Sequence, residues 1–200
     1  TFIHYLLENV NRDVCERGGY GEVDKPALRQ LVHHYVDLYA QTMIDGYDQK
    51  GARFRYLFSR LRETACAIVE NIADEMAVSD FRPIAFELGF GGRDGQLPAI
   101  TVTEGSTALS VRGKVDRVDG WIKDGKLYLR VVDYKTGQKA FDLSDVRYGL
   151  GIQMLLYLFA LQKEGSGYFG MPVVPAGVLY TPAREIISRE DRSIPPEKLE

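Results

Sequence analysis

The dipeptide Asp124-Gly125 constrains the fold of this chain more than any other short segment. It lies between two runs rich in Val, Leu and Tyr, residues 108–122 and 126–135, and Asp-Gly between two strands favours a two-residue type I′ turn. A loop made of these two residues alone fixes the pairing of the strands, beginning with Lys123 opposite Lys126. The sequence therefore predicts an antiparallel hairpin with a defined register.

Following this register inward places Asp116 opposite Asp133 and Lys114 opposite Lys135. Side chains directly opposite each other in an antiparallel pair share a face, with Cβ atoms about 4.5–5.5 Å apart. Lys135 is two residues from Asp133 and therefore shares that face. Two facing carboxylates repel each other unless a positive charge lies between them, and Mg²⁺ is commonly bound by one or two carboxylates together with waters and phosphates. The register therefore predicts a divalent-metal site with a lysine beside it.

Such a patch suits hydrolysis of a phosphodiester bond. A bound divalent metal lowers the pKa of water and neutralises charge on a phosphate oxygen. Beside it, Lys135 can hold or deprotonate the attacking water, or stabilise the transition state. A simpler interpretation stays open, in which Asp133 and Lys135 are solvated strand residues, because a D-x-K tripeptide often arises by chance. The register match with Asp116 favours the functional interpretation.

Elsewhere the apolar pattern changes from helical to strand-like along the chain. Helical spacing occurs from Ile3 to Val10 and throughout about 24–78, where Gly46 and Gly51 mark a join. The other expected elements are strands at 85–90, 108–122, 126–135 and 173–180, and an apolar helix over about 145–163 with Asp142 or Ser144 as its N-cap. This order predicts an α/β fold with a helical insert.

Charge and cysteine content narrow the functional classes. With 25 basic and 28 acidic residues the net charge is −3, so any contact with nucleic acid needs a local basic patch. The longest stretch without charge, 148–162, is too short and too mixed to span a bilayer, and no secretory signal opens the chain. Cys15 and Cys66 lie far apart and fit a reducing compartment. We therefore expect a cytoplasmic protein with no membrane partner, and a fragment of a longer polypeptide, because the chain opens inside a helical pattern.

Four motifs, in this order along the chain, resemble those of the RecB-like nucleases of the PD-(D/E)XK superfamily. The segments are His4-Tyr5-Leu6-Leu7-Glu8 (H-x-x-L-E), Gly113-Lys114-Val115-Asp116-Arg117-Val118-Asp119 (G-x-x-D-R-x-D), Asp133-Tyr134-Lys135 (D-Y-K) and Gln153-Met154-Leu155-Leu156-Tyr157 (Q-x-x-x-Y). The wider sequence is similar to the C-terminal nuclease domain of AddB-type (RexB) subunits. The resemblance implies a restriction-endonuclease-like core, a mixed sheet flanked by helices. Residues 1–200 would form a single nuclease domain, with a helical insertion at about 20–80 and the core at about 81–182.

The resemblance also implies roles for particular residues. Lys135, Asp116 and Asp133 would be catalytic, with Gln153 and Tyr157 orienting the site and the DNA strand. The implied metal ligands are His4, Asp116, Asp133, the backbone carbonyl of Tyr134 and, as a further acid, Glu87. The basic residues expected to contact DNA are Arg117, Lys139 and Arg147.

Cofactors, partners and rival functions follow from the same resemblance. Mg²⁺ is the expected metal, with Mn²⁺ able to replace it because imidazole suits Mn²⁺ better. AddB-type domains bind an iron–sulfur cluster through one cysteine before the histidine motif and three in a later C-x-x-C-x(5)-C-like run. Neither segment lies in this fragment, so no cluster is expected in it. The expected function is a DNA exonuclease domain that works with an AddA-type helicase–nuclease subunit in double-strand-break resection. The alternatives are a catalytically silent DNA-binding or scaffold module, and a CRISPR-associated RecB-like exonuclease or restriction-type endonuclease.

Overall fold

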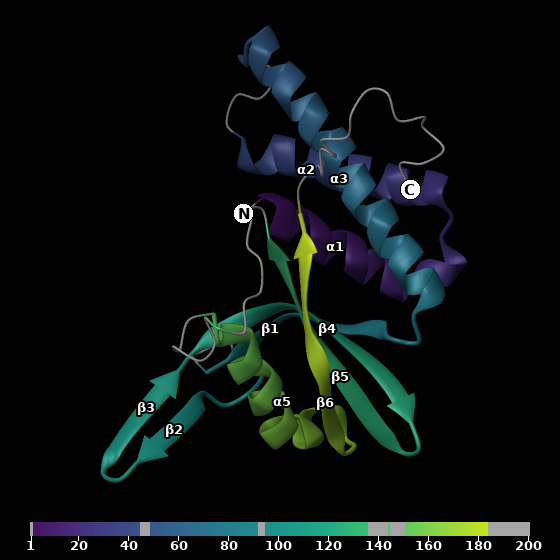
Figure 1. Ribbon diagram of the computed structural model, residues 1–200. Helices are drawn as coiled ribbons and strands as arrows, with labels where there is room; N and C mark the ends of the chain where they lie inside the picture. Colours follow the sequence, from purple (N-terminus) through teal and green to yellow (C-terminus); the bar gives the residue numbers. More distant parts are fainter. Residues whose placement is uncertain (1, 45–48, 92–94, 136–143, 145–150, 184–200) are drawn as a thin grey trace.

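A computed structural model describes residues 2–44, 49–91, 95–135, 144 and 151–183 of the chain. Two sheets form in this part, a four-stranded sheet of order β1-β4-β5-β6 and a two-stranded β2-β3 ribbon that projects away from it (Figure 1). The main sheet is mixed, since β1, β4 and β5 pair antiparallel and β5 and β6 pair parallel. The elements are α1 (Phe2–Glu16), the short 3₁₀ helix η1 (Tyr20–Glu22), α2 (Lys25–Met43), α3 (Ala52–Val78), β1 (Arg82–Phe90), β2 (Ile100–Glu104), β3 (Thr107–Val111), β4 (Gly113–Lys123), β5 (Lys126–Lys135), α5 (Gln153–Phe169) and β6 (Val173–Pro182).

The hairpin forms with the predicted register. Pairing runs from Lys123↔Lys126 to Arg117↔Val132, and the turn residues Asp124 (φ 50°) and Gly125 (φ 71°) both have the positive φ that a type I′ turn requires. Beyond Arg117↔Val132 the β4–β5 ladder ends. The predicted continuation of the ladder, from Asp116 opposite Asp133 to Lys114 opposite Lys135, is therefore wrong, and the strand that pairs with the end of β5 is β6.

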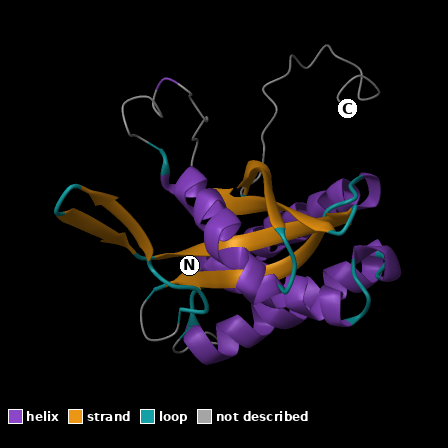
Figure 2. Ribbon diagram, turned by 90° about the horizontal axis from the view of Figure 1, so that it is seen from below, coloured by secondary structure: helices purple, strands orange, loops and turns teal. Residues whose placement is uncertain are grey.

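Helices cover both faces of the sheet (Figure 2). On one face, α1, α2 and α3 form a core with Val132 and Tyr134 of β5. On the other face, α5 packs on Leu129 and Val131. Alternate side chains of β5 thus pack into two separate hydrophobic cores, as expected for a strand covered on both sides. The mixed sheet flanked by helices confirms the predicted α/β class.

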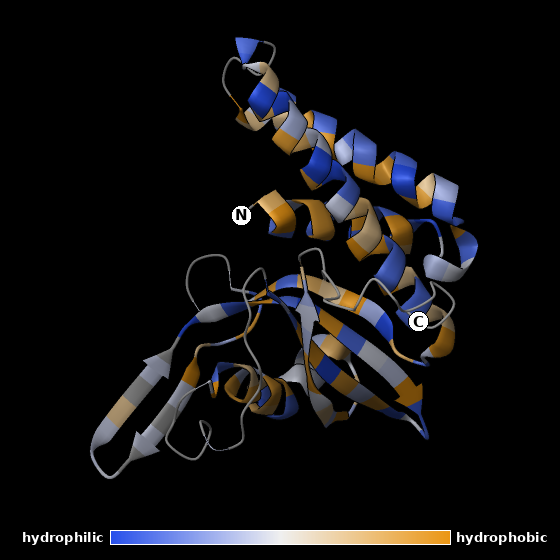
Figure 3. Ribbon diagram, turned by 45° about the horizontal axis from the view of Figure 1, so that its top comes forward, coloured by the Kyte–Doolittle hydropathy of each residue, from blue (hydrophilic) through white to orange (hydrophobic). Residues whose placement is uncertain are grey.

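The α1–α3 layer follows from local signals that the sequence carries. Helix α2 begins after Asp24, whose carboxylate accepts a hydrogen bond from the Ala27 N–H at 2.8 Å, and Pro26 lies in the first turn. The expected helical stretch 24–78 divides into α2 and α3 near the two predicted glycines. Helix α1 lies between the sheet and these two helices and is coloured largely as hydrophobic near its beginning (Figure 3). None of the helices in the described ranges is long and apolar enough to cross a membrane.

Several predicted boundaries differ from the structure. The single strand expected at 108–122 is two strands, β3 and β4, separated at Arg112, and β2 was not predicted. The helix expected at about 145–163 is seen as α5 from Gln153 to Phe169, while residues 145–150 and the candidate cap Asp142 lie outside the described residues. Helix α5 continues past its expected end because Gly165 packs closely against Val173 of β6, and this tertiary contact outweighs the poor helix propensity of glycine.

Candidate active site

The predicted acidic and basic side chains meet where the β4–β5 ladder ends. Asp116 Oδ2 accepts a hydrogen bond from the backbone N–H of Tyr134 at 2.8 Å, in place of a further ladder bond. His4 of α1 approaches the same oxygen, with its Nε2 atom 3.4 Å away. On β5, Lys135 Nζ lies 2.5 Å from Asp133 Oδ2. The side chains of these four residues are between 16% and 32% exposed, so a substrate can reach them from solvent.

Burial and charge make Asp116 hard to ionise. Burial raises its pKa above the usual value, and the nearby Asp133 carboxylate raises it further. The N–H of Tyr134, His4 and Lys135 oppose this rise without cancelling it. In addition, Asp133 Oδ2 is a buried atom that has no hydrogen-bond partner of good geometry, although Lys135 is close. A further positive charge at this point would favour the ionised form of Asp116.

Glu87 lies beside Asp116 on the neighbouring strand. Both residues fall between the paired positions Phe86↔Arg117 and Leu88↔Val115. The alternation of faces breaks there, since Arg117 faces the α1–α3 layer while Val115 belongs to the α5 core. Glu87 itself has a positive φ of 50°. Leu88 and Phe90 join the α5 core, whereas Phe86 lies under the guanidinium of Arg12 at 5.7 Å.

The acid at this position already has a basic partner. Lys114 Nζ lies 3.3 Å from Glu87 Oε2. Burial raises the pKa of Glu87, Lys114 lowers it, and the carboxylates of Asp116 and Glu8 raise it again. Glu87 is thus close enough to the candidate site to affect its charge.

The donor set suits a cation that the substrate helps to hold. Within the described ranges, no group of three or more His, Cys, Asp or Glu side chains is arranged to bind a metal ion. Mg²⁺, however, usually binds through one or two carboxylates and completes its octahedron with waters and phosphate oxygens. Asp116 and Asp133 supply such a pair, and the buried Asp133 oxygen without a hydrogen bond is the kind of atom that a cation would satisfy. The residues present therefore fit a divalent cation.

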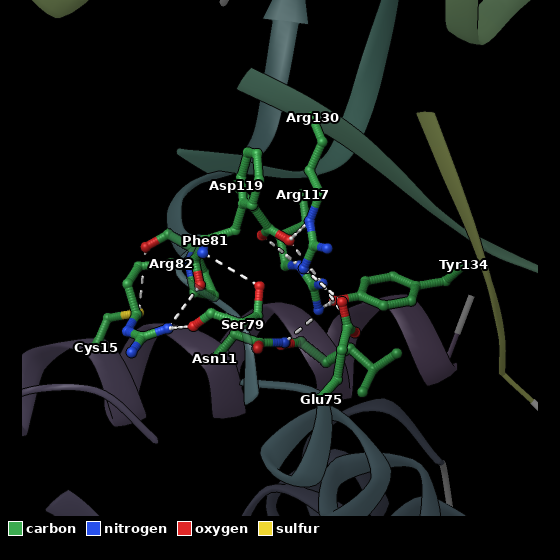
Figure 4. Close-up of polar contacts among 12 residues, drawn as sticks. Asn11, Cys15, Glu75, Ser79, Phe81, Arg82, Arg117, Asp119, Arg130 and Tyr134 are labelled. Carbon is green, nitrogen blue, oxygen red and sulfur yellow. Dashed lines mark hydrogen bonds and ion pairs between the residues drawn. The ribbon is translucent and has the colours of Figure 1, made fainter. Parts of the chain in front are cut away.

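Arg117, expected to contact DNA, is instead in the core. Its side chain is fully buried, and its Nε and Nη2 atoms donate to the two carboxylate oxygens of Asp119 at 2.7 and 2.9 Å (Figure 4). Arg130 Nε also donates to Asp119, at 2.8 Å, and Arg130 pairs with Glu75 of α3. The DNA-binding assignment of Arg117 is therefore wrong, because the bidentate pair with Asp119 holds the guanidinium away from solvent. The other two expected DNA contacts, Lys139 and Arg147, lie outside the described residues.

Gln153 and Tyr157 form a hydrogen-bonded pair on α5. Gln153 Nε2 donates to the Tyr157 hydroxyl at 2.8 Å, and the Tyr157 ring stacks on Phe90 with 5.2 Å between centroids. A Cβ at Gly113 would stand 1.9 Å from the Tyr157 hydroxyl oxygen, so only glycine fits there. The structure thus joins the first residue of one motif to the last residue of another. The predicted role of this pair in orienting DNA stays a prediction.

Two buried polar residues near this site were not predicted from the sequence. Asn11 is fully buried on α1 and Asp119 on β4. A signal for each was present: Asn11 follows Leu7 by four residues within the apolar helical stripe, and Asp119 follows Arg117 by two, which places them on one strand face. Cys66 is buried, whereas Cys15 is half-buried and its thiol contacts the carbonyl of Pro83. Burial raises the pKa of both thiols.

Comparison with known proteins gives consistent results. A family model described as the PD-(D/E)XK nuclease superfamily matches residues 1–197. Among curated relatives, the chain is similar to an ATP-dependent helicase/deoxyribonuclease subunit of Acetivibrio thermocellus, with 34% identity over 201 residues, which cover 100% of this chain and 18% of the relative. The protein of the same name from Caldanaerobacter subterraneus subsp. tengcongensis is also 34% identical, covering 99% of this chain and 17% of the relative. The chain therefore spans under a fifth of the length of these relatives.

Proposed function

Because this chain belongs to the PD-(D/E)XK nuclease superfamily, we propose that it hydrolyses phosphodiester bonds of DNA with the help of a divalent cation. One observation carries the proposal: Asp116, Asp133 and Lys135 come together at the end of the β4–β5 ladder, although the strands no longer pair there. An ordinary solvated strand would leave these charges dispersed. Here they are half-buried, and one carboxylate oxygen has no hydrogen bond.

The residues divide the work of hydrolysis. Asp116 and Asp133 would hold the cation, with His4 and the Tyr134 carbonyl as further ligands and Glu87 as a nearby acid. When bound, the cation supplies a nucleophilic water at neutral pH and neutralises charge on the phosphate. Lys135 then holds the attacking water or donates to the phosphate oxygen on which charge develops. Gln153 and Tyr157 would orient the DNA strand.

The relatives suggest the biological setting. They carry the name of a subunit of an ATP-dependent helicase/deoxyribonuclease. We infer that this chain is the nuclease part of such a subunit, acting in the cytoplasm on DNA ends beside an AddA-type helicase–nuclease partner. Mg²⁺ is the proposed cation, with Mn²⁺ as a substitute. Digestion of one strand during double-strand-break resection is the corresponding activity.

Substitution of Lys135 tests the proposal. In the intact protein with its helicase partner, Lys135→Ala should lower cleavage of one strand by about 10²–10⁴-fold, because a positioned acid–base group contributes that much. ATP hydrolysis should continue at the wild-type rate. Lys163→Ala is the matched control, since Lys163 is a highly exposed lysine on α5, next to Glu164. Normal cleavage by Lys135→Ala would refute the assignment.

One observation favours the silent DNA-binding or scaffold module as a second candidate. Lys135 already lies against Asp133, and Lys114 lies against Glu87, so two of the acids have basic partners without any metal. The two functions differ in their response to Mn²⁺. Mn²⁺ should raise the melting temperature of a nuclease but leave that of a silent module unchanged.

A further inference from the structure

The position of Asp133 and Lys135 relative to Asp116 is not set by strand pairing. The ladder between β4 and β5 stops at Arg117↔Val132, one residue short of both aspartates. The residue between Asp133 and Lys135 is Tyr134, and two adjacent residues of β4 hold it. Asp116 accepts a hydrogen bond from its backbone N–H at 2.8 Å, and Arg117 Nη1 donates to its hydroxyl at 3.0 Å.

From this arrangement we propose that Arg117 and the Tyr134 hydroxyl are positioning residues of the active site. They act through Tyr134 to set where Asp133 and Lys135 lie opposite Asp116, and they touch neither substrate nor cation. The inference rests on the proposed function, because it explains how that site is assembled. It also assigns the buried Arg117 a role in positioning the site instead of in contacting DNA.

The arginine is held so that one donor is left for the tyrosine. Its Nε and Nη2 atoms are both used by Asp119, which is itself fully buried and also accepts from Arg130. Glu75 Oε2 lies 3.9 Å from Nη2. Nη1 is therefore directed to the Tyr134 hydroxyl, and Figure 4 shows the guanidinium between Asp119 and that ring. A lysine offers no such planar fork and cannot serve Asp119 and Tyr134 together.

Helix α1 closes the network from the other side. The Asn11 Nδ2 atom lies 3.4 Å from the Tyr134 hydroxyl and donates more closely to the Leu7 carbonyl, at 2.5 Å. The Asn11 carbonyl oxygen accepts from the Tyr20 hydroxyl at 2.7 Å. Tyr20 and Tyr134 are both almost wholly buried. The network thus contains two buried tyrosine hydroxyls, of which only Tyr134 belongs to the segment that carries the catalytic groups.

These two hydroxyls allow a matched experiment. Tyr134→Phe and Tyr20→Phe each remove one buried hydroxyl and keep the ring, so a merely structural role predicts similar losses for both. We expect Tyr134→Phe to lower kcat by about 10–100-fold with KM for DNA unchanged, the usual range for residues that orient metal ligands. We expect it also to weaken Mn²⁺ binding about tenfold in equilibrium dialysis without DNA. Tyr20→Phe should lower the melting temperature but keep kcat and Mn²⁺ affinity.

Two further variants, measured in the same intact protein, separate the possible failures. Arg117→Lys should reproduce the kcat and Mn²⁺ losses of Tyr134→Phe, and it supplies the test if the phenylalanine variant does not fold. If Lys135→Ala is inactive while Tyr134→Phe and Arg117→Lys keep wild-type kcat and Mn²⁺ affinity, the positioning role is overturned and the proposed function stands. Equal losses of kcat in both phenylalanine variants also overturn it. If Lys135→Ala cleaves normally, the proposed function falls, and the positioning role falls with it.

Discussion

Two groups of charged side chains lie next to each other on β4 and β5, and they are held in different ways. Asp116, Asp133 and Lys135 are half-buried, and one carboxylate oxygen has no hydrogen bond. Arg117 and Asp119 are fully buried, and each is hydrogen-bonded to more than one partner. The difference teaches how to separate a structural charge from a functional one in this fold. The structural charges are fully hydrogen-bonded within the protein, whereas the functional charges are partly exposed and include one carboxylate oxygen without a well-formed hydrogen bond, which a ligand could supply.

Removing one member of the buried pair should give the largest loss of stability. Asp119→Ala leaves the buried Arg117 guanidinium with no counter-charge nearer than Glu75, 3.9 Å away, which costs about 3–5 kcal/mol of unfolding free energy. Asp133→Ala should cost much less, because Asp133 and its partner Lys135 are partly exposed. Urea denaturation of both variants measures the difference. The double variant Arg117→Met, Asp119→Leu should recover most of the loss, since no charge is then left unpaired. Equal losses for Asp119→Ala and Asp133→Ala would remove the distinction between the two groups.

The stability gained from a divalent cation should depend on the half-buried group alone. A ligand that binds only the folded protein adds about 2.7 kcal/mol when its concentration is 100 times its Kd. We expect Mn²⁺ to give such a gain in thermal unfolding and EDTA to remove it. Asp116→Asn should abolish the gain, while Lys114→Met should keep it. A gain that persists in Asp116→Asn would place the cation elsewhere.

The hairpin could be predicted from the sequence because its signal is local. Asp124-Gly125 sets both the turn and the register, and β5 has the predicted bounds, Lys126–Lys135. The end of the ladder could not be predicted in this way. It is decided by which neighbours the two strands have at that point, β1 for β4 and β6 for β5. Such neighbours are distant in the sequence, and no nearby residue pattern specifies them.

For the predicted site residues, too, local sequence was informative and contacts between distant segments were not. The convergence of Asp116, Asp133 and Lys135 followed from register, although the final geometry depends on the Tyr134 N–H rather than on a ladder pair. Arg117 was assigned to DNA from the family resemblance, and its burial depends on Asp119 two residues later on the same strand face. The close packing of the Tyr157 hydroxyl against Gly113 could not be predicted from the sequence, because it is a tertiary contact between β4 and α5.

Alkaline pH should weaken the buried network through its tyrosines. Burial raises the pKa of Tyr20 well above its ordinary value, so the folded protein keeps the phenol proton after the unfolded chain has lost it near pH 10. The stability from this group is therefore fully present below about pH 10 and falls above it, by at most about 1.4 kcal/mol per pH unit for one proton. Tyr20→Phe should make the fall less steep by up to that amount in urea titrations at pH 9–11. Identical slopes for variant and wild type would contradict the linkage. The pKa of Tyr134 is also raised, to about 12, so some pH dependence remains in the variant.

The ion pair between Lys114 and Glu87 should give the smallest effect. Like the buried Arg117–Asp119 pair, it joins a basic side chain to a carboxylate, with 3.3 Å between Nζ and Oε2. Unlike Arg117, however, the Lys114 side chain is 59% exposed. Exposed pairs contribute at most about 1 kcal/mol, because solvent screens them and both side chains lose entropy on pairing. Lys114→Met should therefore change the unfolding free energy by less than about 1 kcal/mol, and 0.5 M NaCl should reduce even this difference. Urea denaturation at low and high salt measures both quantities, with Lys163→Met as the control for loss of an exposed lysine. A loss as large as that of Asp119→Ala would show that burial of the partner, rather than exposure of the lysine, decides the strength of a pair at this end of the sheet.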